Sequence, residues 1–232
     1  MLFANRAEAG RTVARALSSY ADRPDVLVLA LPRGGVPVAY QIARALHAPL
    51  DIFLVRKLGV PGHEEMAMGA IAADGTRVIN DDAVRTLDIP DDIIDVVAEE
   101  ERQEIERRAR AYRGDRPASD VHGKVIILVD DGLATGSSMR AAVAALRKRN
   151  PARIIVAVPV GSAQTCEEFA LEADEVVCAR TPDPFYAVGL WYGDFSQLSD
   201  EEVRDMLKQA AREYAAGERA REPQRVGREE HF

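Results

Sequence analysis

The chain has few cysteines and no long hydrophobic segment, and both absences limit the class of protein that it can be. Only Cys166 and Cys178 occur among 232 residues, and their spacing matches neither a disulfide framework nor a metal site. No apolar run approaches the roughly 18 residues of a membrane-spanning helix, and the N-terminus lacks the apolar core of a signal peptide. No N-x-S/T glycosylation site is present. We therefore expect a cytoplasmic protein in a reducing compartment, with no membrane partner.

Positive charge is also in short supply. The sequence contains 30 Lys and Arg residues against 38 Asp and Glu residues, which gives a formal net charge of −8. Because non-specific binding to a duplex requires a broad cationic surface, we do not expect nucleic acid to be a general partner. The hydrophobic fraction of 47% and the charged fraction of 29% are ordinary globular values, which excludes disorder of the whole chain.

Several common catalytic motifs are missing. No Lys follows Gly136 as a P-loop requires, and no G-x-G-x-x-G follows the first predicted strand, which argues against ATPases and dinucleotide-binding proteins. His63-Glu64 lacks the second His of H-E-x-x-H, and G-x-S-x-G does not occur, so no motif supports a zinc hydrolase or a serine hydrolase. The four histidines are scattered, and we interpret them as structural.

Apolar segments of strand length alternate with segments of helical periodicity. Strands are predicted at residues 25–31, 50–55, 124–129, 153–158 and 175–179, and helices at 36–46, 138–149 and 163–173. Another helix near the N-terminus is predicted to be capped by Asn5. This alternation predicts an α/β fold with a doubly wound, mainly parallel sheet that is covered on both faces.

Three segments depart from the alternation. Residues 68–80 predict a β-hairpin that turns at Asp74-Gly75, within a flexible insertion at about 59–80. Residues 91–113 predict a long charged helix with a mostly solvated surface. Residues 216–232 combine Arg with Glu, Gly and Pro and predict a disordered tail. We therefore expect one domain over residues 1–215, followed by this tail.

The most informative segment is VIILVDDGLATGSS at residues 125–138. A buried strand ends in Asp130 and Asp131 and turns through small residues into a helix. The turn offers backbone N–H groups and hydroxyl groups, and the helix offers its positive end, so together they predict a cradle for a phosphate group. A simple strand-to-helix turn would also explain the acids and glycines, but it would not explain the density of hydroxyl donors.

This segment closely resembles the signature of the type I phosphoribosyltransferases, a hydrophobic strand followed by two acids and an A-T-G-S/T turn. The resemblance extends over about residues 3–215, and it is to a bacterial branch of that family rather than to a named salvage enzyme. It implies the type I phosphoribosyltransferase fold, with an inserted β-hairpin and a small C-terminal hood at about residues 181–198. It also implies phosphoribosyl pyrophosphate (PRPP) as donor substrate, Mg²⁺ as cofactor and a homodimer as the assembly.

The resemblance also implies roles for the residues of this segment. Asp130 and Asp131 would be the catalytic acids, lie against the ribose hydroxyls, and hold the metal together with water and the donor. The 5-phosphate of the donor would bind Ala134, Thr135, Gly136, Ser137 and Ser138. In this interpretation, Gly136→Val should abolish donor binding while the fold survives, because the branched side chain would occupy the space of the phosphate.

Three cations follow the first two predicted strands. Arg33 precedes Gly34 and Gly35, which let the backbone approach a ligand, while Arg56 and Lys57 end the second strand, LDIFLVRK. Because the carboxyl ends of these strands open into one crevice, the cations predict a pyrophosphate site. By resemblance, the family's pyrophosphate loop lies here, often with a non-proline cis peptide. The alternative interpretation is a tight turn and solvent-exposed cations.

Residues 183–195 are rich in aromatic side chains and include the only Trp of the chain. A packed lid would explain this density. By resemblance, the segment is the hood over the acceptor, where Phe185 or Trp191 would stack on a nucleobase. Asp183 would then contact an exocyclic amine of the base or the metal.

These observations favour an Mg²⁺-dependent transfer of the 5-phosphoribosyl group from PRPP to a nitrogen acceptor, expected to be a nucleobase, in nucleotide salvage. Two alternatives remain. One is a regulator that senses PRPP and binds RNA or protein, which the Arg-rich tail keeps open. The other is a phosphohydrolase, which is weaker because D-D-G-L-A-T does not place its acids and Thr as D-x-D-x-T.

Overall fold

A computed structural model describes residues 2–229, with residues 64, 65 and 221–229 described by their backbone alone. Five parallel strands form the central sheet in the spatial order β2-β1-β6-β7-β8. Their bounds are β1 Val26–Ala30, β2 Leu50–Ile52, β6 Val125–Val129, β7 Arg153–Val158 and β8 Glu175–Cys178. β1 and β6 are neighbours and end together, with Ala30 opposite Val129. The loops after these two strands therefore start side by side, as predicted for the crevice of a doubly wound sheet.

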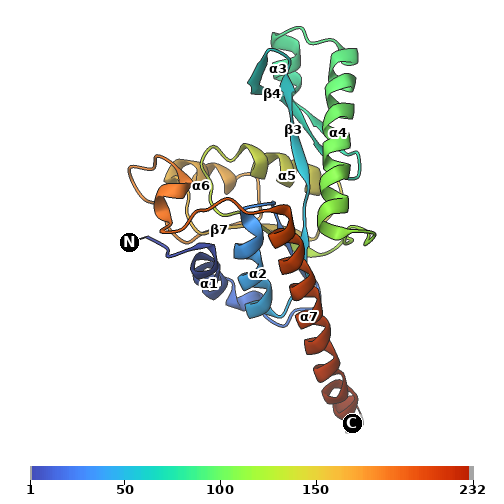
Figure 1. Ribbon diagram of the computed structural model, residues 1–232, viewed down its shortest axis with the longest axis vertical. Coiled ribbons are helices and arrows are strands. Elements are labelled where there is room, and N and C mark those ends of the chain that lie inside the picture. The colour runs from blue at the N-terminus through green and yellow to red at the C-terminus, as the bar shows by residue number, and fades with distance from the viewer. Residues whose placement is uncertain (1, 230–232) are drawn as a thin grey trace.

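Helices cover both faces of this sheet, so the α/β prediction is confirmed (Figure 1). One face packs against α1 Arg6–Ala16, α2 Gly35–Leu46 and α7 Asp200–Glu229, and the other against α5 Ser137–Arg147 and α6 Ala163–Phe169. Val26 and Val28 of β1 join the first layer, while Leu27 and Leu29 join the second. The continuous apolar sequence of this strand follows from burial on both sides.

A second, antiparallel sheet projects from the body of the molecule (Figure 1). Its strands are β3 Val55–Val60, β4 His63–Ala72 and β5 Arg77–Ile79, followed by α3 Asp81–Thr86 and α4 Asp91–Arg113. The predicted turn at Asp74-Gly75 joins β4 to β5. The prediction that Arg56 and Lys57 end the second strand of the central sheet is wrong, because both lie in β3. The Phe53 N–H still bonds to the Ala30 carbonyl, but β1 ends there, so the chain has no strand left to pair with and leaves the sheet.

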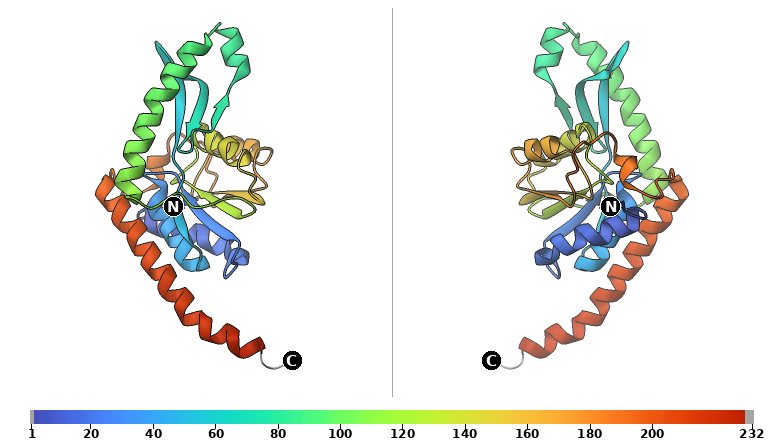
Figure 2. Two further views of the ribbon diagram at one scale, coloured as in Figure 1. Left: turned by 90° about the vertical axis from the view of Figure 1, so that its right-hand side faces the viewer. Right: turned by 90° about the vertical axis from the view of Figure 1, so that its left-hand side faces the viewer.

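Helix α4 lies alongside the antiparallel sheet (Figure 2) and has the predicted bounds. Its outer surface carries Glu–Arg pairs at helical spacing, such as Glu99 with Arg102, in agreement with a solvated face. Its inner surface buries Ile94, Ala98 and Ile105 against the rest of the protein. One face of the helix is therefore packed against the core, and the other is exposed to solvent.

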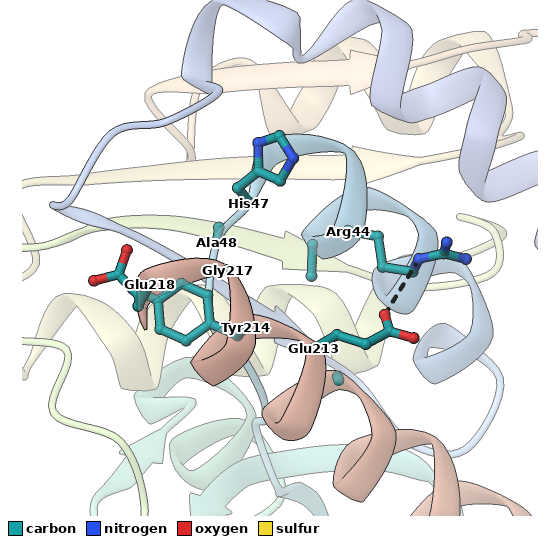
Figure 3. A pocket seen from close by; sticks show the side chains of 9 residues that line it. Arg44, His47, Ala48, Glu213, Tyr214, Gly217 and Glu218 are labelled. Carbon is teal, nitrogen blue, oxygen red and sulfur yellow. Dashed lines mark ion pairs between the residues drawn. The ribbon is translucent and has the colours of Figure 1, made fainter. Parts of the chain in front are cut away.

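Helix α7 packs on α2 and then extends away from the body (Figure 1). Arg44 of α2 and Glu213 of α7 form an ion pair of 3.2 Å beside a pocket of about 250 Å³ (Figure 3). The helix continues to Glu229, through residues for which the composition predicts a disordered tail, and Ala, Glu and Arg in this segment have high helix propensity. Residues 230–232 of that predicted tail lie outside the described residues. No helix in the described part of the chain is long and apolar enough to cross a bilayer.

Candidate active site

The acid pair Asp130-Asp131 lies where β6 ends, in contact with the loop that follows β1. A Cβ on Gly34 would lie 2.0 Å from Asp131 Oδ2, and a Cβ on Gly35 would lie 2.6 Å from the Val129 carbonyl oxygen. The two glycines are therefore required by close contact with the protein itself, whereas the sequence suggested an approach to a ligand. The non-proline peptide bond between Pro32 and Arg33 is cis.

The two carboxyl groups have different surroundings. Burial, together with the charge of Asp131, raises the pKa of Asp130 well above its ordinary range. Burial also raises the pKa of Asp131, but a hydrogen bond and the charge of Arg6 oppose this effect. Arg6 Nε donates to Asp131 Oδ2 at 2.8 Å, and the two side chains are only 12% and 15% exposed. Asp131 is therefore the member of the pair that has a cation as its partner.

The turn after the acid pair presents hydrogen-bond donors to solvent. Because α5 begins at Ser137, the N–H groups of its first turn have no partner within the helix. The hydroxyls of Thr135 and Ser137 are exposed and lie 3.1 Å apart. From behind, Thr165 Oγ1 donates to the Ala134 carbonyl oxygen at 2.8 Å and holds the turn in place. Exposed donors at the positive end of a helix are suited to bind a phosphate group.

Gly136 is needed by the turn for a reason that the sequence did not reveal. Its φ of 72° lies in the left-handed region, and a Cβ would lie 2.4 Å from Cε2 of the fully buried Phe169. The expectation that Gly136→Val would spare the fold is therefore wrong, because the added side chain would enter the core between α5 and α6. Such a variant cannot separate phosphate binding from folding.

A cavity of about 580 Å³ opens between the end of β6 and the antiparallel sheet. Asp130 and Ser138 line one side of it, and Arg56 and Lys57 of β3 line another. Arg56 and Lys57 therefore line the same cavity as Asp130, as predicted for a shared site, although they belong to the antiparallel sheet and not to the central sheet. Cations and hydroxyls around an open cavity favour a polyanionic ligand.

Helix α4 supplies cavity residues that sequence reasoning assigned to a solvated surface. Glu101 and Arg108 line the cavity together with Ile105. The Glu101 carboxylate accepts a hydrogen bond of 2.5 Å from Arg56 Nε and partly neutralises this cation. The spacing of the three residues places them on one face of the helix, and this could be predicted from the sequence. The sequence does not identify the part of the protein that this face lies against.

Arg33 is not among the residues that line the cavity, although Pro32 before it is. Its guanidinium lies 3.6 Å from Asp200 at the start of α7, and both side chains are about one-third exposed. Asp200 also accepts a hydrogen bond of 2.8 Å from the Tyr112 hydroxyl of α4. In this structure Arg33 therefore belongs to a junction of α4, α7 and the loop after β1.

The N-terminal segment packs against residues 181–198, the predicted hood. The Phe3 N–H donates to the Trp191 carbonyl oxygen at 2.9 Å, and the Gly193 N–H donates to the Phe3 carbonyl oxygen at 2.7 Å. A Cβ on Gly132 would lie 2.4 Å from Val188 Cγ1, so the hood rests directly on the turn after the acid pair. The Tyr192 hydroxyl donates to the Asp131 carbonyl oxygen at 2.5 Å.

The predicted acceptor residues all lie in this hood. Asp183 is exposed and precedes a cis bond to Pro184, whereas Phe185 and Trp191 are half-buried and pack around Phe3 and Tyr192. The Trp191 indole N–H is one of two buried side-chain polar atoms without a hydrogen-bond partner in the described part of the chain. The hood is thus a packed unit that still holds one donor for which a ligand could be the partner.

Sequence reasoning missed Arg6 and Tyr192 as neighbours of the acid pair. Arg6 lies 125 positions before Asp131 in the chain, so no local motif joins them. Tyr192 stood in the aromatic segment, but its contact with the Asp131 backbone depends on how the hood folds back over β6. Only the tertiary structure brings these residues together.

The acid pair fits one particular way of holding a metal. No group of three or more His, Cys, Asp or Glu side chains that could hold a metal occurs among residues with described side chains. Mg²⁺ is commonly bound by one or two carboxylates together with the phosphates of a substrate. Asp130 and Asp131 fit that mode, in which the ligand brings the remaining oxygen atoms.

Comparison with known proteins gives consistent matches. The family model described as the phosphoribosyl transferase domain matches residues 2–188. Two Mycobacterium tuberculosis proteins, from strains CDC 1551 and H37Rv and provisionally named phosphoribosyl transferases, are each 44% identical over 92% of this chain and 48% of theirs. The chain therefore spans about half the length of these relatives. The crystal structure of TT1426 from Thermus thermophilus is similar with a TM-score of 0.81 and 40% identity, over 89% of this chain and 98% of that chain.

Proposed function

We propose that this chain, which belongs to the phosphoribosyltransferase domain family, transfers the 5-phosphoribosyl group of PRPP to a nucleobase-type nitrogen acceptor and releases pyrophosphate. The observation that carries this proposal is the position of the acid pair. Asp130 and Asp131 lie between an anion-binding turn and a cavity lined by cations, with the hood adjoining. A donor with a phosphate at one end and a pyrophosphate at the other matches this arrangement.

The proposed binding mode uses both ends of the donor. The turn from Ala134 to Ser138 binds the 5-phosphate through backbone N–H groups and hydroxyls. Arg56 and Lys57 bind the pyrophosphate in the cavity, and the loop at Gly34 and Gly35 bounds the site on the side of the acids. Arg33 joins the pyrophosphate site only if it exchanges its partner Asp200 for the ligand.

The acid pair acts on the charge that develops during the reaction. As the bond from the anomeric carbon to the pyrophosphate oxygen breaks, positive charge appears on the ribose ring. A carboxylate beside the ring is a stronger partner for that charge than for the neutral ground state, so Asp131 lowers the barrier. Mg²⁺ held by Asp130 and Asp131 together with the donor would supply positive charge next to the leaving pyrophosphate.

The hood is the proposed acceptor site, and two observations support it. It rests on the phosphate-binding turn and bonds to the Asp131 backbone, so a base held there would lie close to the ribose. The Trp191 N–H needs a partner, and base nitrogens and carbonyl oxygens are acceptors. We propose that Phe185 or Trp191 stacks on the base and that Asp183 accepts from an exocyclic amine. We further propose a homodimer that acts in nucleotide salvage.

The test is the release of pyrophosphate from PRPP across a panel of purine bases, pyrimidine bases and simple amines. We expect release only with Mg²⁺ and with a productive acceptor, together with formation of the matching nucleotide. Binding of PRPP without turnover on any acceptor would favour a PRPP-sensing regulator. Release of inorganic phosphate without an acceptor would favour a phosphohydrolase. Asp131→Asn is the active-site control, because it changes the charge of the acid and little else.

A further inference from the structure

Arg6 makes three contacts that together link the acid pair to the hood. Its Nε donates to Asp131 Oδ2 at 2.8 Å, and a terminal nitrogen donates to the Ser196 carbonyl oxygen at 2.9 Å. Its guanidinium carbon lies 3.9 Å from the centre of the Phe195 ring. The side chain is only 12% exposed, so these contacts are not those of a solvated surface arginine.

The partners of the other site cations show why this contact is specific. Arg56 is paired with Glu101 across the cavity, and Arg33 is paired with Asp200 at the start of α7. Arg6 reaches Asp131 from α1 and is not among the residues that line the cavity, and its backbone position is set by the Asn5 cap at the first turn of that helix. The backbone of Arg6 is thus fixed by the start of α1, and its guanidinium is fixed by its contacts with Asp131, Ser196 and Phe195.

Two contacts tie Asp131 to the hood, one made directly by Tyr192 and one through Arg6. The Tyr192 hydroxyl bonds to its backbone carbonyl oxygen, and Arg6 bonds to its side chain while lying on Phe195. A planar guanidinium bonded to one carboxylate oxygen restricts the rotation of the carboxylate and leaves the other oxygen available to a ligand. Any movement of the hood around Phe195 and Ser196 would therefore move the acid as well.

We propose that Arg6 is a positioning residue for phosphoribosyl transfer, which fixes the Asp131 carboxylate against the ribose and ties it to the acceptor-binding hood. The inference rests on the proposed function, since it gives Arg6 a role only through the acid that stabilises the reacting ribose. A misplacement of a catalytic group by about 1 Å can cost about a hundredfold in rate. The effect of Arg6 should therefore appear in kcat and much less in donor binding.

The test is a double-mutant cycle of Arg6→Ala and Asp131→Asn, with Arg6→Lys as the conservative variant. Arg11→Ala is the matched control, because Arg11 is an exposed arginine on the same helix. For each variant, kcat, the donor KM, the PRPP dissociation constant from calorimetry and the Tm are measured. We expect Arg6→Ala to lower kcat by about ten- to a hundredfold and to change the PRPP dissociation constant by less than about threefold. Arg6→Lys should recover only part of the loss, because it restores the charge but not the planar guanidinium, and Arg11→Ala should behave as wild type.

The cycle separates a positioning role from a structural one. If Arg6 acts through Asp131, removing it from the Asp131→Asn protein should cost little further activity, because the charge that it positions is already absent. An equal loss of kcat in both backgrounds, a normal kcat in folded Arg6→Ala, or no recovery with lysine would each overturn the inference. Should Arg6→Ala not fold, the same cycle with Arg6→Gln, which keeps a planar donor without the charge, gives the same decision. Absence of turnover in the wild type would refute the proposed function, and the inference with it, whereas normal turnover with an indifferent Arg6 would refute the inference alone.

Discussion

Replacing Glu101 with glutamine should tighten the binding of pyrophosphate. Arg56 donates to the Glu101 carboxylate at 2.5 Å, and both residues line the cavity, so an anionic ligand must compete with this carboxylate for the cation. Glutamine keeps a side-chain oxygen that accepts the hydrogen bond, but it removes the negative charge. The variant therefore changes the electrostatics of the cavity with little change in its shape.

The expected size follows from the exposure of the pair. The Arg56 and Glu101 side chains are 35% and 22% exposed, so solvent screens much of their attraction, and about 1 kcal/mol is a reasonable value for their interaction. This value corresponds to roughly a fivefold lower dissociation constant for pyrophosphate. Isothermal titration of magnesium pyrophosphate into both proteins measures it. Glu99→Gln is the control, because Glu99 pairs with Arg102 and does not line the cavity.

The sign of the change decides between two physical descriptions of this ion pair. If Glu101 competes with the ligand, the affinity rises, and the gain shrinks with added salt because screening weakens the removed repulsion. If pyrophosphate instead binds more weakly to Glu101→Gln than to wild type, Glu101 must hold Arg56 in the orientation that the ligand needs. That result would refute a competition between Glu101 and the ligand for Arg56.

Four further predictions concern the acid pair, the turn and the hood. Asp131→Asn should bind PRPP within about tenfold of wild type and lose on the order of 10² in kcat, because the amide keeps hydrogen bonding but not charge, and steady-state kinetics with calorimetry would show it. Asp130→Asn should be more stable than wild type at neutral pH, by about 0.5 to 2 kcal/mol in urea unfolding. Because folding raises the pKa of Asp130, protonation of this group favours the folded wild type. The difference in unfolding free energy between the variant and wild type should therefore vanish toward about pH 4 and grow as the pH rises through the folded pKa. A difference that grows toward acidic pH would contradict this. Gly136→Ala should lower the free energy of unfolding by about 2 to 5 kcal/mol, which is the cost of a left-handed φ in alanine plus the cost of overpacking the core. A Tm equal to that of wild type would show that the added Cβ does not contact Phe169. Truncating the stacking aromatic, Phe185→Leu or Trp191→Leu, should raise the acceptor KM by roughly ten- to a hundredfold with an unchanged donor KM, and if neither variant responds the base must bind elsewhere.

Local patterns were sufficient for the frame of this protein. The continuous apolar run of β1 predicted a strand buried on both faces, because side chains that point to either face of such a strand must be apolar. The alternation of strands with helices predicted a parallel sheet. The two acids and the small, hydroxylated turn after β6 predicted a strand, a turn with hydrogen-bond donors and a helix, since these are neighbours in the chain. That this turn binds an anion stays a prediction. Asp74-Gly75 likewise located the turn between β4 and β5.

The rest was decided by contacts between segments that lie far apart in the chain. Arg6 meets Asp131 only because α1 and the hood pack together above β6, and the two residues are 125 positions apart. Gly136 faces Phe169, a partner that no local pattern identifies. Arg56 lies opposite Asp130 because the antiparallel sheet and α4 fold over the cavity, and α4 carries the same charged pattern on its solvated face and on its cavity face. Sequence periodicity reports whether a side chain is buried, but which residue it meets depends on the packing of whole elements, and that information exists only in the tertiary structure.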